Sequence, residues 1–399
     1  MQTEEKLEWL KRFASDQLNN VILPFWREKV ADPEQGGFHG ELNFDGQIVD
    51  NAPRGLIMNA RILWAFSSVY PLTANPSDLI MAERAFRYLC DFFYDKANGG
   101  YFWTVKQNGT PHETRKQIYA LAFVIYGMSE YYKITNDQEA LKRIIDLFHL
   151  IEEKSFDPEN NGYFEAFAGD WTAVSDLRLS VKDMNEKKTM NTHLHILEAY
   201  TNLYRVWKNE ELLQKTENLI RIFLEKIISP DDSHLKLFFN EKWDAKSSAV
   251  SFGHDIEAGW LLHEAALVTG NAELISKIET LLPSITDAAL EGLSPEGGLY
   301  HESDRSGLHA DHEFEWWPQA EAIVGLLNTY QLTGDGKYIE YAVQTGKFIN
   351  EYFVDHENGE WFFRIDQNLK PIKPHCKAGL WKCPYHNGRA CVELLNRID

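Results

Sequence analysis

The chain has 399 residues, 44% of them hydrophobic and 25% charged, which is typical of a globular protein with a large apolar core. Its formal net charge of -20 argues against nucleic acid and anionic membranes as partners. No apolar run is long enough to span a membrane, and the start, MQTEEKLEWLKRF, is typical of an amphipathic helix and not of a signal peptide.

Six segments that combine an Asp- and Gly-rich turn with an aromatic hairpin recur along the chain, roughly 60 to 70 residues apart. In chain order they cover residues 31–42, 94–105, 156–167, 229–240, 293–304 and 353–364, and the copy at 229–240 is degenerate. Their turn glycines align as Gly37, Gly100, Gly162, Gly298 and Gly359. Each segment predicts a tight turn followed by a β-hairpin.

Two helices are expected between consecutive hairpins. The helix before a hairpin is amphipathic, as in residues 140–156, whereas the helix after a hairpin is apolar nearly all round, as in residues 117–132 and 256–268. Asn, Asp and Gly recur at the turn between the two helices and supply its cap chemistry. These turns lie at 72–79, 134–141, 207–212, 268–274 and 332–338.

This pattern predicts an (α/α)6 barrel, an all-α toroid with short β-hairpins at one end. Helices that are apolar on all sides belong to an inner layer, and amphipathic helices surround them. An open solenoid is the alternative, but it would expose two apolar ends and need capping repeats, which the sequence lacks. We therefore expect twelve main helices in two layers, chain ends close together, and a single domain over residues 1–399.

Polar side chains stand at the start of each apolar helix, where an apolar residue would be expected. Because the repeats are related by rotation, these side chains should meet on the axis at one end of the toroid. They are Asn59, Arg61, Gln117, Tyr119, Asn191, His195, His254, Glu257, Trp317, Gln319, His386 and Arg389.

The histidines of this set are the strongest candidates for chemistry. A lone histidine on an apolar helix is usually a core residue, but three at equivalent phases of the repeat favour a shared function. His195 shares a helix face with Asn191, so we expect His195 to face the axis and His193 to be structural. His254 and Glu257 are three residues apart, so we expect Glu257 to orient the His254 imidazole.

No metal site and no cofactor are expected. The helix starts carry no HExxH spacing, and the loop with His309, Asp311, His312 and Glu313 is better explained as a solvated loop. No nucleophile elbow and no glycine-rich phosphate loop occur. The cysteines lack the spacing of a zinc site or a disulfide framework, which favours a reducing, cytoplasmic location; they are Cys90, Cys376, Cys383 and Cys391.

Histidines with an arginine nearby suit proton transfer next to a carbonyl group. Imidazole titrates near neutrality and can remove or return a carbon-bound proton. An arginine and the N-terminal ends of the inner helices can stabilise the oxyanion that results. Sugar epimerisation and isomerisation are reactions of this kind.

Five motifs carry a family resemblance that covers essentially the whole chain: NARILWAFS, NTHLHILEAYTNLYRVW, SFGHDIEAGWLLHEAA, WWPQAEAIVG and WKCPYHNGRACVE. Together they resemble the N-acylglucosamine 2-epimerase superfamily, and within it the cellobiose 2-epimerases most closely. The resemblance implies an (α/α)6 barrel and a cofactor-independent isomerase that interconverts the glucose and mannose configuration at the reducing-end residue of cellobiose-type disaccharides.

The resemblance also implies roles for individual residues. It makes His254 and His386 the two acid–base groups and His195 the residue that assists ring opening and polarises the C1 oxygen. It makes Arg61 the stabiliser of a cis-enediolate and Glu257 the carboxylate that supports its neighbouring histidine. The positions that match sugar contacts are Tyr119, Asp183, Asn191, Trp317 and Trp381.

Several alternatives remain open at this point. Mannose 2-epimerases share the same core motifs, so the substrate is a disaccharide or a monosaccharide, and an aldose–ketose isomerase is a further possibility. A glycoside hydrolase on the same fold would use carboxylates such as Asp183, Glu257 and Glu315. A binding protein without activity would not require the histidines. A small-molecule sugar is the expected partner, and a monomer or a homodimer the expected state.

Overall fold

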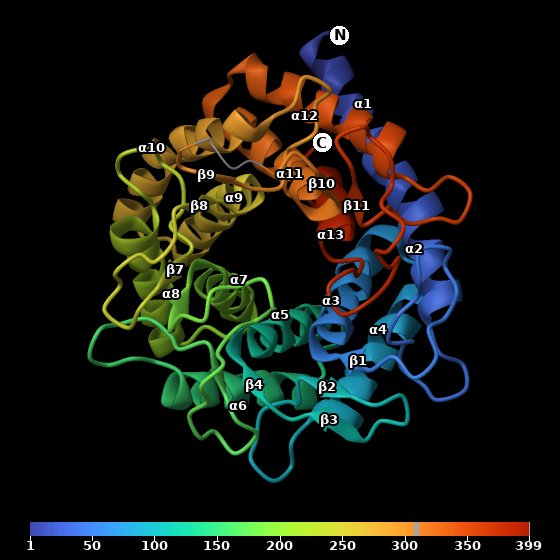
Figure 1. Ribbon diagram of the computed structural model, residues 1–399, viewed down its shortest axis with the longest axis vertical. Helices are drawn as coiled ribbons and strands as arrows, with labels where there is room; N and C mark the ends of the chain where they lie inside the picture. The colour runs from blue at the N-terminus through green and yellow to red at the C-terminus, as the bar shows by residue number, and fades with distance from the viewer. Residues whose placement is uncertain (307–310, 399) are drawn as a thin grey trace.

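The computed structural model describes residues 1–306 and 311–398, and their helices form two concentric layers (Figure 1). The inner layer contains α3 (Leu56–Thr73), α5 (Ile118–Thr135), α7 (Met190–Val206), α9 (Phe252–Thr269), α11 (Trp316–Thr333) and α13 (His386–Arg397). The outer layer contains α1 (Thr3–Asp16) with α2 (Leu23–Phe25), α4 (Pro76–Tyr88), α6 (Gln138–Lys154), α8 (Glu210–Ile222), α10 (Ala272–Ala289) and α12 (Gly336–Phe348). The predicted (α/α)6 barrel is confirmed.

Short helical turns extend most outer helices toward the hairpins. Five are π-helical, η1 (Gln17–Ile22), η2 (Trp26–Val30), η3 (Leu89–Phe93), η4 (Phe223–Ile227) and η6 (Ile349–Phe353), and η5 (Leu290–Gly292) is a 3₁₀ turn. The strands are β1 (Arg54–Gly55), β2 (Thr104–Val105), β3 (Pro111–Glu113), β4 (Lys116–Gln117), β5 (Ala166–Phe167), β6 (Lys188–Thr189), β7 (Phe238–Phe239), β8 (Ala249–Val250), β9 (Ser303–Asp304), β10 (Phe314–Glu315) and β11 (Arg364–Ile365).

The strands join neighbouring repeats at the end of the barrel where the inner helices begin. Each strand that directly precedes an inner helix pairs antiparallel with the hairpin of the following repeat, as β4 does with β5 and β6 with β7. The sheet β1–β2–β3 has one extra strand. Leu42 pairs with Ala378 in the same way and so links the last repeat to the first.

In four of the six repeats the turn aspartate binds a buried cation in the segment before the next inner helix. Asp95 Oδ1 accepts hydrogen bonds from two backbone amides of its own turn, and Oδ2 accepts one from the buried Lys116 Nζ at 2.7 Å. The same pairing recurs in three other repeats, between Asp32 and Arg54, Asp157 and Lys188, and Asp355 and Lys377. A buried cation is stable only with such a partner, which explains why the aspartate recurs.

Two repeats lack both members of this pair. Ser229 and Ser294 stand where the other turns have aspartate, and Val250 and Phe314 stand two residues before their inner helices, where the first three repeats have lysine or arginine. Because both the aspartate and its cationic partner are absent, no member of the pair is left buried without a counter-charge. These are the turns that open the segments at 229–240 and 293–304.

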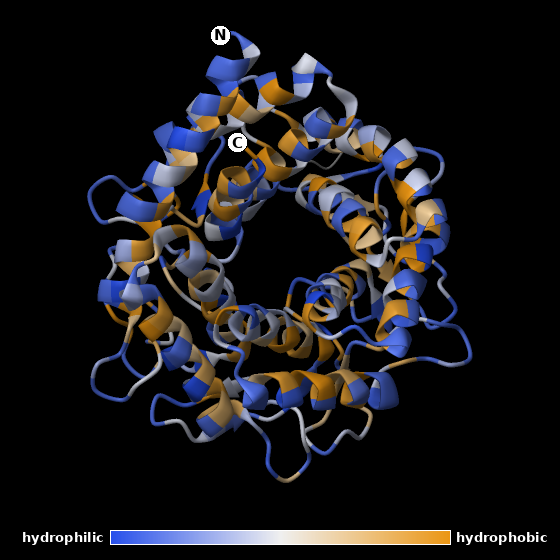
Figure 2. Ribbon diagram, turned by 180° about the vertical axis from the view of Figure 1, so that it is seen from behind, coloured by the Kyte–Doolittle hydropathy of each residue, from blue (hydrophilic) through white to orange (hydrophobic). Residues whose placement is uncertain are grey.

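The helix turns follow the predicted cap chemistry. Asn136, Gly270 and Gly334 end inner helices in the left-handed conformation. Side chains then cap the next outer helix by accepting a backbone hydrogen bond, as Asp137 does at α6; the other caps are Asn75, Asn209, Asn271 and Asp335. Figure 2 shows that the outer helices turn polar faces outward and apolar faces toward the inner layer.

The two ends of the chain lie in the same sector of the ring, as predicted (Figure 1). Helix α1 packs against α12 and α13, and Lys6 Nζ lies 2.5 Å from Glu340 Oε2. All four cysteines are free thiols. No helix in residues 1–306 and 311–398 combines the length and the apolar character that a membrane span requires.

Candidate active site

The sixth residues of five inner helices come together at the centre of the barrel. The Arg61 guanidinium lies 4.1 Å from the Phe123 ring, and that ring lies 4.8 Å from the His195 ring. Two of the five residues, Glu257 and Glu321, carry carboxyl groups that share the guanidinium of Arg389 on α13. The five residues are Arg61, Phe123, His195, Glu257 and Glu321.

Arg389 connects three buried glutamates on three different inner helices. Its guanidinium donates to Glu257 Oε1 at 2.6 Å and to Glu321 Oε1 at 2.7 Å, and it also bonds Glu198. The Tyr385 hydroxyl donates to Glu198 at 2.5 Å. Removal of one member would leave a buried charge unpaired, so this network fixes the relative positions of α7, α9, α11 and α13.

Each of the three candidate histidines is anchored through its Nδ1 atom. His195 Nδ1 lies 2.9 Å from Glu198 Oε2, His254 Nδ1 lies 2.7 Å from Ser251 Oγ, and His386 Nδ1 lies 2.6 Å from Glu321 Oε1. Among the described residues, none is hydrogen-bonded to Nε2 of these histidines. An imidazole held through Nδ1 has a fixed orientation and presents Nε2 for proton transfer.

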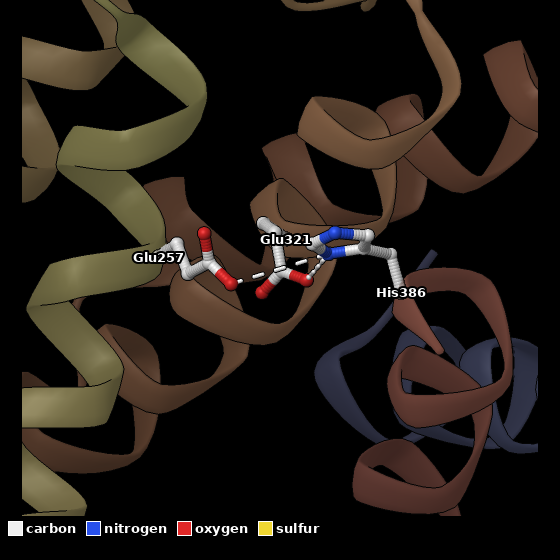
Figure 3. A group of neighbouring side chains, drawn as sticks. All are labelled: Glu257, Glu321 and His386. Carbon is white, nitrogen blue, oxygen red and sulfur yellow. Dashed lines mark hydrogen bonds and ion pairs between the residues drawn. The ribbon is translucent and has the colours of Figure 1, made fainter. Parts of the chain in front are cut away.

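Two expectations about these residues are wrong. Glu257 does not orient His254, because Ser251 bonds that imidazole while the Glu257 carboxyl bonds Arg389 and lies 4.0 Å from His386 (Figure 3). The three histidines also do not share one phase, since His254 is the third residue of α9 and His195 the sixth of α7. Sequence spacing shows which residues share a face but not which partner from a neighbouring helix competes for them.

His193 has the structural role expected of it. Its Nε2 accepts a hydrogen bond from the backbone N–H of Tyr163 at 2.9 Å, and its Nδ1 lies 2.7 Å from the Thr189 carbonyl oxygen. Burial lowers its pKa to about 4, so the ring is neutral. Both nitrogens are used within the protein, and His193 has none left for chemistry.

Burial keeps the other three imidazoles neutral as well. It lowers the pKa of His254 to about 3, and it lowers the pKa of His386 well below its ordinary value, helped by Arg61 and Arg389. Burial also lowers the pKa of His195, although Glu198 opposes the shift. Neutral imidazoles can act as bases without first losing a proton.

The carboxyl groups of the network differ in their state. Burial, followed by repulsion from Glu321, raises the pKa of Glu257 well above its ordinary value. Burial also acts to raise the pKa of Glu198, but Arg389 and His195 outweigh it and hold that pKa low. Three buried carboxyl groups around one guanidinium are therefore not all charged.

The aromatic candidates surround these histidines. The Trp317 ring lies 4.6 Å from the His254 ring and 5.6 Å from the His386 ring, measured between centroids. The Tyr119 hydroxyl accepts from Arg61 at 2.7 Å, and the Trp381 ring lies 6.3 Å from the Tyr119 ring. The structure thus brings together aromatic residues from three different repeats.

A cavity of about 390 Å³ lies beside His254. Asn191 and Asp183 line it, so it joins one of the histidines to two further candidates. Asp183 accepts from the Ser180 backbone N–H at 2.7 Å, and Asn191 Oδ1 has no hydrogen-bond partner among the described residues. The other polar side chains that line the cavity come mainly from the loop 177–186 and from His301, Glu302 and Asp311.

Glu257, Glu321 and His386 lie close enough together to be considered as metal ligands (Figure 3). Arg389 already donates to both carboxyl groups, and His386 Nδ1 is bound to Glu321. A divalent cation there would have to compete with the guanidinium charge, so the donor set fits a hydrogen-bonded network better. The absence of a metal stays a prediction.

The loop considered earlier for metal binding is engaged in ion pairs. Arg364 bonds both Asp311 and Glu313. The His312 ring packs 4.8 Å from the Tyr300 ring, while His309 lies outside the described residues. These partners account for the acidic side chains without a metal ion.

Sequence reasoning missed the residues that anchor the histidines. Glu198, Glu321, Ser251 and Tyr385 were not candidates, although a sequence signal for two of them existed. A carboxyl group within an otherwise apolar inner helix needs a buried partner, and Glu198 and Glu321 both stand in such helices. Ser251 and Tyr385 carry no comparable signal.

Comparison with known proteins agrees with this geometry. Residues 36–390 match the family model described as N-acylglucosamine 2-epimerase (GlcNAc 2-epimerase). A cellobiose 2-epimerase of Bacteroides fragilis is 47% identical over 97% of this chain and 99% of its own length, and one of Dictyoglomus turgidum is 38% identical over 98% and 100%. The solved structure of cellobiose 2-epimerase from Bacillus thermoamylovorans B4167 superposes with a TM-score of 0.94 at 38% identity and covers 98% of this chain and 100% of that one.

Proposed function

This chain belongs to the N-acylglucosamine 2-epimerase family and is an isomerase, a sugar 2-epimerase, and we propose that it acts on the reducing-end residue of cellobiose-type β-1,4 disaccharides. Inversion at C2 requires one base on each face of that carbon. The observation that carries the proposal is the pair His254 and His386, both anchored through Nδ1 and both packed against Trp317.

The proposed reaction begins with opening of the pyranose ring to the aldehyde, which acidifies the C2 proton. Nε2 of one histidine removes that proton, and a cis-enediolate forms. Rotation about the C2–C3 bond turns the other face of C2 toward the second histidine, which takes up a proton from solvent and returns it to C2, while the first histidine releases its proton to solvent. His254 and His386 exchange these roles when the reaction runs in the opposite direction.

The negative charge of the enediolate would be stabilised by Arg61 and His195. Arg61 is buried, and its Nε atom has no hydrogen-bond partner among the described residues. The Glu198 carboxylate would hold His195 in the orientation that presents Nε2 to the sugar oxygen. Each such contact is worth roughly 3–4 kcal/mol in transition-state stabilisation.

The cavity beside His254 supports a disaccharide over a monosaccharide. A volume of about 390 Å³ falls within the range of small-ligand sites. It extends from His254 to polar side chains of the loop 177–186, which can meet the hydroxyl groups of a second sugar ring. We propose that Asp183 and Asn191 contact the sugar there, and that Tyr119, Trp317 and Trp381 do so around the histidines.

Product analysis after separate incubation with cellobiose, mannose and N-acetylglucosamine tests this proposal. We expect cellobiose to yield 4-O-β-glucosyl-mannose and, in heavy water, to carry deuterium at C2. A ketose product would instead indicate an aldose–ketose isomerase, and conversion of mannose alone would indicate a monosaccharide 2-epimerase. Release of free glucose would indicate a glycoside hydrolase.

We also propose that residues 1–399 form one barrel domain, that the enzyme uses no cofactor, and that it works as a monomer or a homodimer in the cytoplasm. The network of Arg389 supports catalysis without a cofactor, because it fixes neutral imidazoles beside a guanidinium. Activity after exhaustive chelation and dialysis, with sedimentation to give the mass in solution, tests these points.

A further inference from the structure

The last residue of each turn occupies the same place in all six repeats. Its carbonyl oxygen accepts a hydrogen bond from the backbone N–H of the turn's first residue, as Gly100 does from Asp95. By this criterion Glu360, and not Gly359, is the equivalent residue in the sixth repeat. The six residues are Gly37, Gly100, Gly162, His234, Gly298 and Glu360.

Glycine is required in the turns where neighbouring rings fill the space of a side chain. A Cβ atom at Gly37 would lie 2.5 Å from the Tyr88 ring, and one at Gly162 would lie 2.4 Å from the Trp243 ring. In the fourth and sixth repeats no neighbouring ring in the described part of the chain fills that space, and the turn residue itself places an ionisable side chain there. These are the two repeats whose inner helices carry His254 and His386.

In the fourth repeat the side chain of His234 reaches the residue that follows His254. His234 Nδ1 lies 2.7 Å from Asp255 Oδ2, and the Leu235 backbone N–H donates to Asp255 Oδ1 at 2.8 Å. His234 and Asp255 are both buried. The first turn of α9 is thereby tied to the hairpin at both oxygens of one carboxyl group.

In the sixth repeat the side chain of Glu360 reaches the residue that follows His386. Glu360 Oε1 accepts hydrogen bonds from Asn387 Nδ2 at 2.6 Å and from Lys382 Nζ at 2.6 Å, and all three side chains are buried. The Glu360 backbone has a φ of +63°, a conformation that favours glycine. A glutamate in this conformation indicates that its side chain is needed there.

We propose that His234 and Glu360 are positioning residues for the two proton-transfer histidines. Each fixes the first turn of an inner helix through the residue next to the histidine, Asp255 in one case and Asn387 in the other, and so sets the direction of the imidazole Nε2. The proposal rests on the proposed function of His254 and His386.

The ring itself does not need an ionisable residue at this place. In the third and fifth repeats the inner helix contacts the hairpin directly, because His193 accepts from the Tyr163 N–H and Gln319 from the Leu299 N–H, and the turns end in glycine. Those helices carry neither of the two bases. The ionisable turn residue therefore occurs in the repeats that carry a proposed base and is not required for assembly of the ring.

Glycine substitution tests the proposal, because four of the six turns already fold with glycine. We expect His234→Gly to slow the exchange of the C2 proton with heavy water from one epimer of the disaccharide, and Glu360→Gly to slow it from the other epimer, by ten- to a hundredfold each. KM should change by about twofold or less, since sugar contacts remain. The imidazole NMR signal of His254 should shift only in the first variant, and that of His386 only in the second.

The controls remove the outward bond of the same two residues. Glu291→Ala removes the 3.4 Å contact to His234 Nε2, and Trp26→Phe removes the 2.5 Å bond to Glu360 Oε2. We expect both to lower the melting temperature without changing exchange. If a glycine variant does not fold, His234→Gln or Glu360→Gln should show a milder loss for the same epimer.

Equal slowing of exchange from both epimers, or no slowing in either glycine variant, would overturn the positioning role. If the wild-type protein does not exchange the C2 proton of any sugar tested, the proposed function fails. The NMR comparison then still tests whether His234 and Glu360 orient the two imidazoles. Unchanged His254 and His386 signals in the glycine variants would then count against the proposal.

Discussion

Nδ1 of His386 lies 2.6 Å from Oε1 of Glu321 on the adjacent inner helix α11, and both side chains are buried (Figure 3). The bond crosses between two repeats, and the same carboxyl oxygen also accepts from Arg389 at 2.7 Å. The orientation of one proposed base thus depends on its neighbouring repeat.

Glu321→Gln should lower kcat by about 10²-fold and leave KM nearly unchanged, because an amide can hold the imidazole in the wrong tautomer while sugar contacts persist. Steady-state kinetics on cellobiose check this. Glu264→Gln is a matched control, since Glu264 bonds Arg205 outside the histidine network, and it should cost stability only. A Glu321→Gln enzyme with wild-type kcat would contradict the role of this carboxyl group.

Ser251→Ala should lower kcat by about fivefold, which is the effect of losing roughly 1 kcal/mol of orientation from one hydrogen bond. The Ser251 hydroxyl is the only hydrogen-bond partner of the His254 imidazole among the described residues. Ser251→Thr keeps the hydroxyl and should restore most of the rate. Equal rates for the Ala and Thr variants would show that the contact at 2.7 Å does not matter for turnover.

The pH profile should show no loss of activity from histidine protonation near neutrality. Burial lowers the pKa of His254 from its ordinary value of 6.5 to about 3, and the pKa of His386 lies well below 6.5 as well. Since kcat/KM reports the free enzyme, it should stay level from pH 8 down to about pH 5. An acidic limb with its midpoint near 6.5 would mean that at least one base is more solvated than the structure shows.

Glu165→Gln should make the protein more stable at alkaline pH. Burial raises the pKa of Glu165 from 4.5 to about 8, although bonds from Thr192 and Thr189 oppose the shift. Below pH 4.5 the carboxyl group is protonated in both states. Between pH 4.5 and 8 only the unfolded chain ionises, so its contribution to stability is lost as pH rises through the folded-state pKa.

The glutamine variant has no such proton to lose. The difference in unfolding free energy between variant and wild type should therefore shift toward the variant by on the order of a few kcal/mol between pH 5 and pH 9. Chemical denaturation at several pH values measures it. A difference that is independent of pH would show that Glu165 is ionised in the folded protein.

The barrel was predictable because its evidence is local and repeated. Helix period, cap residues and turn composition each recur in every unit, and rotation converts these repeats into a ring. Several candidate residues also lie close together, although the three histidines do not occupy one phase of the repeat. His195, His254 and His386 came from this reasoning.

The hydrogen-bond partners were not predictable in the same way. Glu257 was paired with His254 because both stand on one helix face, but Arg389 from another helix takes that carboxyl group. The alignment of Gly359 with the other turn glycines had the same weakness, since it followed residue type where the backbone hydrogen bonds select Glu360. Contacts between helices depend on side-chain direction, which spacing within one segment does not contain.

The contact between Lys6 and Glu340 joins residues 334 positions apart, and Leu42 pairs with Ala378 over a similar distance. During synthesis on a ribosome, α1 therefore emerges long before the helices against which it packs. Contacts of such long range form slowly, so closing of the circle should be the last step of folding. Until then the first and sixth repeats each expose an apolar flank, and this interval is when the nascent chain most needs protection by chaperones.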